Sequence, residues 1–316
     1  MNKDTLKYIG RRLVTALATL FVICVVLFLM VHYLPGSPIN NEKLSAAQRA
    51  AIEAKYGLDK PLVVQFVTYV KNMLTGDFGV SYNMYKDMEV SYLVGSAIKL
   101  SFSYGIAAVI FGTIVGILLG VSAALNRNTI WDSIATGISV VGVSIPSFVF
   151  AFLFLILFSS TLRILPSTYS SANPIVSSIL PVFALSMSVI ANVARFTRTE
   201  MIEVLASDYM MLAKAKGLDK NTLIFKHALR NSLIPVITIL GPILVNLMTG
   251  TMVVEKICGV PGLGKLLIQS IQSSDYNIIL ACSFLYAAMY IVMILIIDVS
   301  YGIIDPRIRL TKKRGE

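Results

Sequence analysis

Long apolar runs separated by polar stretches dominate the hydrophobic pattern of the chain. A helix needs about 20 apolar residues to cross the hydrocarbon core of a bilayer, and six segments reach or approach this length. The fourth is the shortest and carries Pro181 near its start. The pattern therefore predicts an all-α integral membrane protein with six transmembrane helices. The expected spans are residues 11–33, 100–125, 134–158, 177–196, 232–254 and 278–300.

The composition agrees with a multi-pass protein of the cell membrane. Of the 316 residues, 56% are hydrophobic and 14% are charged, whereas soluble domains carry about 25% charged residues. The net charge of +10 would also suit a nucleic-acid-binding protein. The basic residues lie between the apolar runs, however, so we expect no nucleic-acid partner. Three cysteines and two histidines predict neither a disulfide framework nor a metal site.

The distribution of lysine and arginine predicts the orientation of the spans, because cytoplasmic loops carry an excess of these residues. With a cytoplasmic N-terminus, the inside segments and their flanks hold 17 basic residues and the short outside segments hold 4. The remaining 6 lie in residues 34–98, a segment too long for the charge rule to constrain. Both termini are therefore expected in the cytoplasm. The inside segments include residues 1–10, 197–231 and the basic tail 301–316, and the main outside segments are residues 34–99 and 255–277.

Small residues and prolines mark several of the spans. Three glycines in the second span recur at every fourth residue, a spacing that lets another helix approach closely. Prolines interrupt later spans; such broken helices often line a translocation path, although proline is also tolerated in spans that only kink. Both interpretations of the prolines stay open. The helix-packing glycines are Gly112, Gly116 and Gly120, and the pathway or kink prolines are Pro146, Pro235 and Pro242.

Ionisable residues are nearly absent from the spans, and Asp298 lies near the inner end of the last one. Ion-driven carriers usually need a buried relay of ionisable groups, so we expect another energy source. An intramembrane enzyme would need a paired nucleophile and base or a metal constellation. His32 stands alone, His227 is in a polar segment, and no HExxH or GxSxG motif occurs. The sequence therefore favours a transport subunit without catalytic residues.

The polar segment 34–99 is expected to contain two short helices. A capping box at residues 45–48 predicts one that closes at Gly57. Asp59-Lys-Pro61 predicts the start of a second, which ends by Gly76. The segment is either a surface cap on the helix bundle or a contact site for an external protein.

Segment 197–231 has the pattern of two short, capped helices. Ser207 is expected at an N-cap, and Gly217 at the position after the helix end. Asp219 is expected to cap the second helix. Such a pair forms a compact knob that can transmit force to a partner. The alternative is an amphipathic hairpin resting on lipid headgroups.

The same segment carries a family signature. Ala213 and Gly217 match the second alanine and the glycine of an "EAA…G" motif, while Met211 and Leu212 replace its glutamate and first alanine. With these departures, the segment resembles the coupling loop of ATP-binding-cassette importer permeases of the oligopeptide, dipeptide and nickel class. Further stretches that resemble the first-type peptide permease subunit are residues 56–61, 76–79, 254–264 and 298–309. Ser274-Asp-Tyr-Asn277 departs from an Arg-Asp-Tyr-Pro pattern frequent in that family.

The resemblance implies a type I importer fold and a set of partners. These are a second, similar permease subunit, two cytoplasmic ATPases that bind ATP and magnesium, an external binding protein and membrane lipids. The chain itself is then expected to bind no cofactor. The cargo implied is short peptides, with nickel or another metal chelate as the alternative. The coupling residues implied are Asp208, Ala213, Lys214, Gly217, His227, Arg230 and Asn231.

One glycine-rich stretch imitates a nucleotide site. Gly259-Val-Pro-Gly-Leu-Gly-Lys265 matches the first part of a phosphate-binding loop, but Leu266 stands where the serine or threonine that holds magnesium is needed. The predicted topology also places this stretch outside the cell. The glycines are therefore expected to shape a tight turn between two helices.

Overall fold

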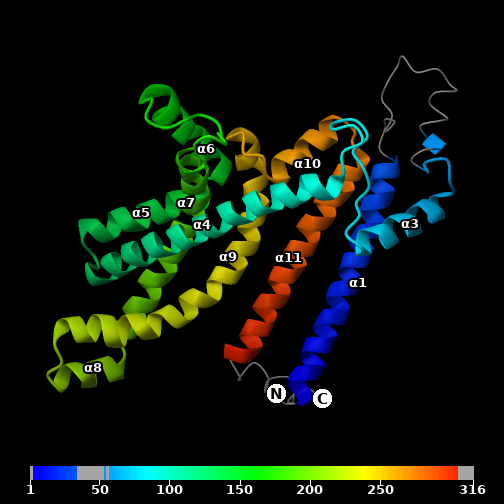
Figure 1. The fold of residues 1–316 in the computed structure, drawn as a ribbon. Helices are drawn as coiled ribbons and strands as arrows, with labels where there is room; N and C mark the ends of the chain where they lie inside the picture. The colour runs from blue at the N-terminus through cyan, green and yellow to red at the C-terminus, as the bar shows by residue number, and fades with distance from the viewer. Residues whose placement is uncertain (1–2, 34–52, 55–56, 305–316) are drawn as a thin grey trace. The chain divides into compact units, whose positions relative to one another are not determined.

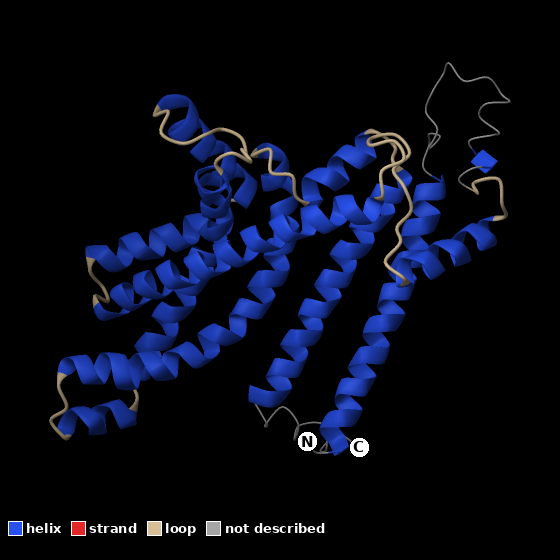
Figure 2. Cartoon of the chain, in the orientation of Figure 1, coloured by secondary structure: helices blue, strands red, loops and turns tan. Residues whose placement is uncertain are grey.

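The computed structural model describes residues 3–33, 53–54 and 57–304. Helices dominate these residues, and β pairing within them is limited to an isolated bridge between Val80 and Glu89 (Figure 2). The all-α fold predicted from the sequence is confirmed. The helices fall into two compact units, one built mainly from residues 1–101 and 261–302 and the other mainly from residues 102–260.

The first unit joins the two ends of the chain. One of its helices, α3, begins directly after Pro61 and ends before Gly76, which has a φ of +81°. These are the start and stop signals that the sequence offers. The capping box at residues 45–48 lies outside the described residues. The helices of this unit are α1 (Lys3–Tyr33), α3 (Leu62–Leu74), the beginning of α4 (Val90–Leu125), α10 (Leu263–Gln272) and most of α11 (Tyr276–Ile304).

A buried carboxylate holds the loop after α3 in place. Asp275, which is fully buried, lies just before α11. It accepts a hydrogen bond from Ser81 Oγ at 2.5 Å and others from the backbone N–H groups of Tyr82, Asn83 and Met84 at 3.2, 3.0 and 3.0 Å. Four donors satisfy a charge that would otherwise be costly to bury. The carboxylate therefore ties the loop between α3 and α4 to the start of α11.

The second unit contains a broken span. Helices α5 and α6, the latter continued by η1, are apolar enough to cross a membrane as a pair but meet at an angle of 107°. The break lies at Pro146, and Ile145 before it is extended at φ −95° and ψ 126°, as expected before a proline. The helices here are the rest of α4, α5 (Ile130–Ser144), α6 (Ser147–Phe154), η1 (Leu155–Thr161), α7 (Pro174–Leu205), α8 (Asp208–Ala215), η2 (Thr222–Leu229) and α9 (Arg230–Ile257).

In the described residues, five helices are long and apolar enough to span a membrane on their own, and the bent pair brings the total to six. Several helices are longer than the apolar runs that predict them. Helix α4 begins at Val90, and α7 continues to Leu205. The extension of α7 contains Arg198, Glu200 and Glu203, which have good helix propensity. Segment 255–277, expected as a loop, contains α10.

The glycine face of α4 packs directly on α7. A Cβ added at Gly112 would lie 2.6 Å from Val189 Cβ, and one added at Gly116 would lie 2.7 Å from Val193 Cβ. At Gly120 the nearest atom would be the backbone oxygen of Ala194, at 2.6 Å. Real Cβ atoms do not approach this closely, so only glycine permits the observed distance between the two helices.

Candidate coupling site

Segment 197–231 begins in the last turns of α7 and continues through α8 and η2. Helix η2 lies beside α8 (Figure 1). Ser207 occupies the N-cap of α8 with an extended backbone at φ −74° and ψ 153°. Its hydroxyl does not cap the helix, however, because Oγ donates to the carbonyl of Val204 at 2.6 Å. The first turn carries Asp208, whose charge suits the positive end of the helix dipole.

The turn after α8 is a Schellman motif built on Gly217. This residue has a φ of +78°. Its N–H donates to the carbonyl of Lys214 at 3.0 Å, and the N–H of Leu218 donates to that of Ala213 at 3.4 Å. These two bonds satisfy carbonyls that the helix end leaves open. The left-handed backbone explains why a glycine stands at this position.

Asp219 caps the start of the second helix of the segment. The Oδ2 atom of Asp219 accepts a hydrogen bond from the backbone N–H of Thr222 at 3.0 Å, which is the capping role expected from the sequence. Hydrogen bonds from the Thr222 side chain and backbone hold the pKa of the Asp219 carboxyl below its ordinary value. Residues 222–229 form a π-helix that runs directly into α9. The second helix is therefore the beginning of a long span and not the separate short helix that the sequence pattern predicts.

A small apolar core fastens the two helices to the ends of α4 and α7. Met210 of α8 is 5% exposed, and Ile224 and Ala228 of η2 are buried against it. Met201 of α7 and Ala124 of α4 complete the cluster. The segment is therefore a packed knob whose position follows that of α4 and α7.

The outward side of the knob is apolar as well as charged. Tyr209, Met211, Leu212 and Phe225 are 46%, 63%, 57% and 63% exposed. Two of them, Met211 and Leu212, replace the glutamate and first alanine of the expected motif, so these departures from the motif are the sequence signal of the apolar surface. Of the predicted coupling residues, Asp208, Lys214, Gly217, Arg230 and Asn231 are exposed, and Ala213 and His227 are half-buried.

An ion pair near the knob was missed by the sequence interpretation. Arg198 of α7 donates through Nε and Nη2 to the two carboxylate oxygens of Asp132 on α5, at 2.5 and 2.8 Å. The Asp132 side chain is 7% exposed and also accepts the N–H of Asn128 at 3.0 Å. A bidentate pair of this kind fixes the angle between its helices. It joins residues 66 positions apart, a separation that leaves no local signal.

Replacing Arg198 by methionine is expected to destabilise the protein, because it leaves the buried Asp132 carboxylate without its two strongest donors. The cost of such a loss is about 1–3 kcal/mol, and thermal unfolding of the purified complex measures it. Arg195→Met is the matched control, since Arg195 is an exposed arginine on the same helix. Equal effects of the two substitutions would show that the ion pair is not structurally important.

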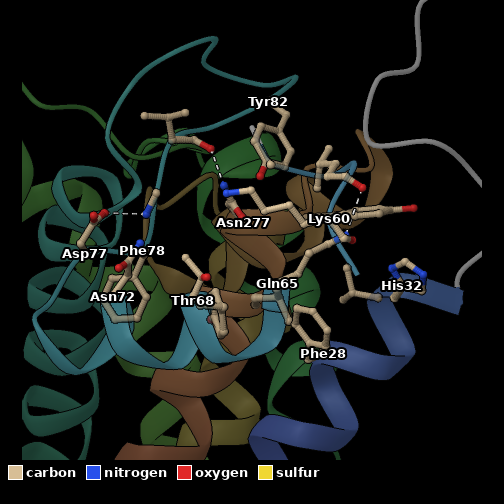
Figure 3. Close-up of a pocket in the computed structure, with 18 of the residues that line it drawn as sticks. Phe28, His32, Lys60, Gln65, Thr68, Asn72, Asp77, Phe78, Tyr82 and Asn277 are labelled. Carbon is tan, nitrogen blue, oxygen red and sulfur yellow. Dashed lines mark hydrogen bonds between the residues drawn. The ribbon is translucent and has the colours of Figure 1, made fainter. Parts of the chain in front are cut away.

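The first unit holds a cavity of about 1040 Å³, here called the α3 cavity. Figure 3 shows Gln65, Thr68 and Asn72 of α3 along one wall, with Phe28 and His32 of α1 nearby. Across the cavity lies Asn277, whose Nδ2 donates to the carbonyl of Val80 at 2.8 Å. This is the asparagine that departs from the family pattern. In the described part of the chain no group of three or more His, Cys, Asp or Glu residues could hold a metal ion.

The glycine-rich stretch 259–265, which resembles a phosphate-binding loop in sequence, connects α9 to α10. Gly259 has a φ of +70° and follows the end of α9, and α10 starts at Leu263 after the N-cap Gly262. The stretch therefore lies between two helices, and the strand that would precede a phosphate-binding loop is absent among the described residues around it. The turn interpretation from the sequence agrees with this geometry.

Comparison with known families decides what kind of protein carries this knob. The family model described as "Binding-protein-dependent transport system inner membrane component" matches residues 116–310. The chain belongs to this family. A second model, for the N-terminal part of such membrane components, matches residues 5–92.

Relatives of this transport family match nearly the whole chain. It is 41% identical over 304 residues to the dipeptide transport system permease protein DppB of Lactococcus lactis, covering 96% of this chain and 99% of the relative. It is 42% identical over 305 residues to the oligopeptide transport system permease protein OppB of Haemophilus influenzae, with the same coverage. The identity to the Bacillus subtilis DppB is 40% over 309 residues, or 97% and 99% of the two chains.

Solved structures support the fold of this family member. An inward-facing MetNI methionine ABC transporter matches with a TM-score of 0.56 and 14% identity, over 68% of this chain and 97% of the other. An amino acid ABC transporter crystallised with histidines matches with a TM-score of 0.52 and 16% identity, over 66% and 92%. The chain therefore has the fold of an ABC importer permease and is a multi-pass membrane protein.

Proposed function

We propose that this chain is a transmembrane subunit of an ATP-driven importer and forms half of a translocation path for short peptides. The observation that supports the cargo is the identity of 40–42%, over nearly the whole length, to permeases named for dipeptide and oligopeptide transport. The other half of the path belongs to a second, similar permease. An external binding protein delivers the peptide.

The knob of segment 197–231 is the proposed contact with the cytoplasmic ATPases, which carry the ATP and magnesium. Two features support this role. The knob is packed onto α4 and α7, so a movement of the ATPases reaches the spans. Its exposed apolar side chains, such as Met211 and Phe225, are the kind that a protein groove covers.

Uptake measurements test the proposed cargo. In its native host, deletion of the gene is expected to abolish uptake of labelled di- and oligopeptides, and a plasmid copy is expected to restore it. Nickel uptake serves as the comparison in the same strains. Loss of nickel uptake with normal peptide uptake would contradict the peptide assignment while leaving the importer fold intact.

The orientation proposed from the charges places both termini and the knob in the cytoplasm. Cysteine introduced at Lys86 is then expected to react with an impermeant thiol reagent in intact cells. Cysteine at Lys220 is expected to react only after permeabilisation. Both positions are exposed, and the native cysteines Cys24, Cys258 and Cys282 are buried, so their background labelling is low. Labelling at position 220 in intact cells would show that the topology is the opposite of the proposed one.

A further inference from the structure

Helix α3 has two opposite faces of different chemistry. Gln65, Thr68 and Asn72 line the α3 cavity (Figure 3). The opposite side carries large apolar residues at spacings of four and seven, which places them on one face of a helix. Val63, Val67 and Leu74 of this face are 73%, 59% and 79% exposed. This apolar face, defined by Val63, Val67 and Leu74, has no cover within the described chain.

The depth of α3 follows from its contacts with α1 (Figure 1). The Phe66 ring lies 5.3 Å from that of Phe28 and 6.2 Å from that of Phe21. Phe21 is the midpoint of the apolar span Ile9–Tyr33. At a rise of 1.5 Å per residue, Phe28 and Phe21 lie about 8 and 18 Å from the end of that span at Tyr33. A hydrocarbon core of about 30 Å centred on the span therefore includes the level of Phe66.

The single charge of α3 fits the same position. Lys71, in the last turn, is the only charged residue between Leu62 and Leu74 and is exposed. Its place on the helix lies between the apolar and the cavity-lining faces. A lysine with a long aliphatic stem can keep its ammonium group at the level of lipid phosphates while the stem stays in an apolar layer. A polar face with a lysine at its border, opposite an apolar face, is typical of a helix lying in a membrane interface.

We propose that α3 is an interfacial anchor, whose apolar face is covered by phospholipid acyl chains while its polar face walls the α3 cavity. The leaflet is the one nearest Tyr33, which is the outer leaflet in the proposed orientation. A soluble binding protein would not reach the level of Phe66. The exposed apolar surface of α1, which includes Phe21 at 56% exposed, continues onto α3 through the Phe21–Phe66 contact. Lipid on α1 therefore extends onto α3.

Photo-crosslinking in native membranes tests the anchor in the assembled importer. Benzoylphenylalanine is introduced at Val67, on the apolar face, and at Thr68, the adjacent residue on the cavity face. After illumination, the purified chain is expected to gain the mass of one phospholipid when the probe is at position 67 and to show no lipid adduct above background at position 68. Val63 provides a second position on the apolar face if the probe at 67 lowers expression.

A protein adduct at both 63 and 67 would overturn the proposal, because a partner subunit or the binding protein would then cover the apolar face. The absence of any adduct at these positions, together with labelling of cysteines there by an impermeant thiol reagent, would also overturn it by showing a water-exposed face. A probe at Lys220, which is in the knob, controls for lipid adducts that form without contact and is expected to give none. The crosslinking result does not depend on the cargo, so the lipid anchor can fail while the peptide assignment stands, and the reverse also holds.

Discussion

Gly116→Leu is expected to prevent assembly of a functional importer. A Cβ at this position would lie 2.7 Å from Val193 Cβ and 3.0 Å from the backbone oxygen of Ile190. Rotation of the valine side chain does not move its Cβ, so both the Cβ and the backbone oxygen move only if α7 moves. Overpacking of a tight interface costs about 1–3 kcal/mol or more. The displacement of α7 also reaches the knob, since Met201 of α7 belongs to the knob's core.

The measurements for this substitution are the amount of complex purified with its ATPases and the rate of peptide uptake, both of which should fall close to background. Gly105→Leu is the matched control, because it lies on the same helix and a Cβ there meets no atom within 4 Å in the chain. Similar accumulation and uptake by the two variants would refute the close α4–α7 contact.

Gly217→Val is expected to leave the protein inserted in the membrane but to abolish uptake. The φ of +78° is strained for a residue with a Cβ, at a cost of about 1–2 kcal/mol, and a β-branched side chain is worse still. A Cβ there meets no atom within 4 Å, so the chain's own packing tolerates it. The expected loss of uptake then follows from the distorted turn and from the added bulk at the proposed ATPase contact.

Co-purification of the ATPases and peptide uptake together read out this substitution. Gly217→Asn is expected to retain much of both, since asparagine accepts a left-handed backbone more readily. Lys220→Ala, at an exposed position, should be nearly silent. If the knob rested on lipid headgroups instead, removing Lys220 and Lys226 would matter more than adding bulk at Gly217. Normal peptide uptake and normal ATPase binding by the Gly217→Val variant would contradict the assignment of this segment as the coupling site.

Much of the fold could be predicted from local sequence signals. The apolar runs indicated the membrane helices because a span must be apolar over its whole membrane-crossing length. The signals at Pro61, Gly217 and Asp219 were readable because start and stop residues act on their own backbone. The glycines at every fourth residue of α4 predicted close helix packing for the same reason, because sequence spacing alone determines which residues share a helix face.

Contacts between distant residues could not be predicted in this way. Nothing in the glycine spacing of α4 names α7 as its partner. The pairing of Asp132 with Arg198 and the burial of Asp275 depend on where the helices meet. The bend at Pro146 shows the intermediate case, because a proline predicts an interruption but the angle of 107° depends on the surrounding helices. The exposed apolar surface of the knob likewise became visible only when its buried residues were known.

The Asp275 carboxylate has a consequence for synthesis of the protein. Its donors begin at Ser81, 194 residues earlier in the chain. At a translation rate of about 5–20 residues per second, the loop after α3 must wait roughly 10–40 s before its acceptor has been made. During that interval, the N–H groups of residues 82–84 lack the partner that orders them. Folding of the first unit therefore finishes only after Asp275 has been made, and a chain whose translation stalls earlier keeps this loop without its acceptor.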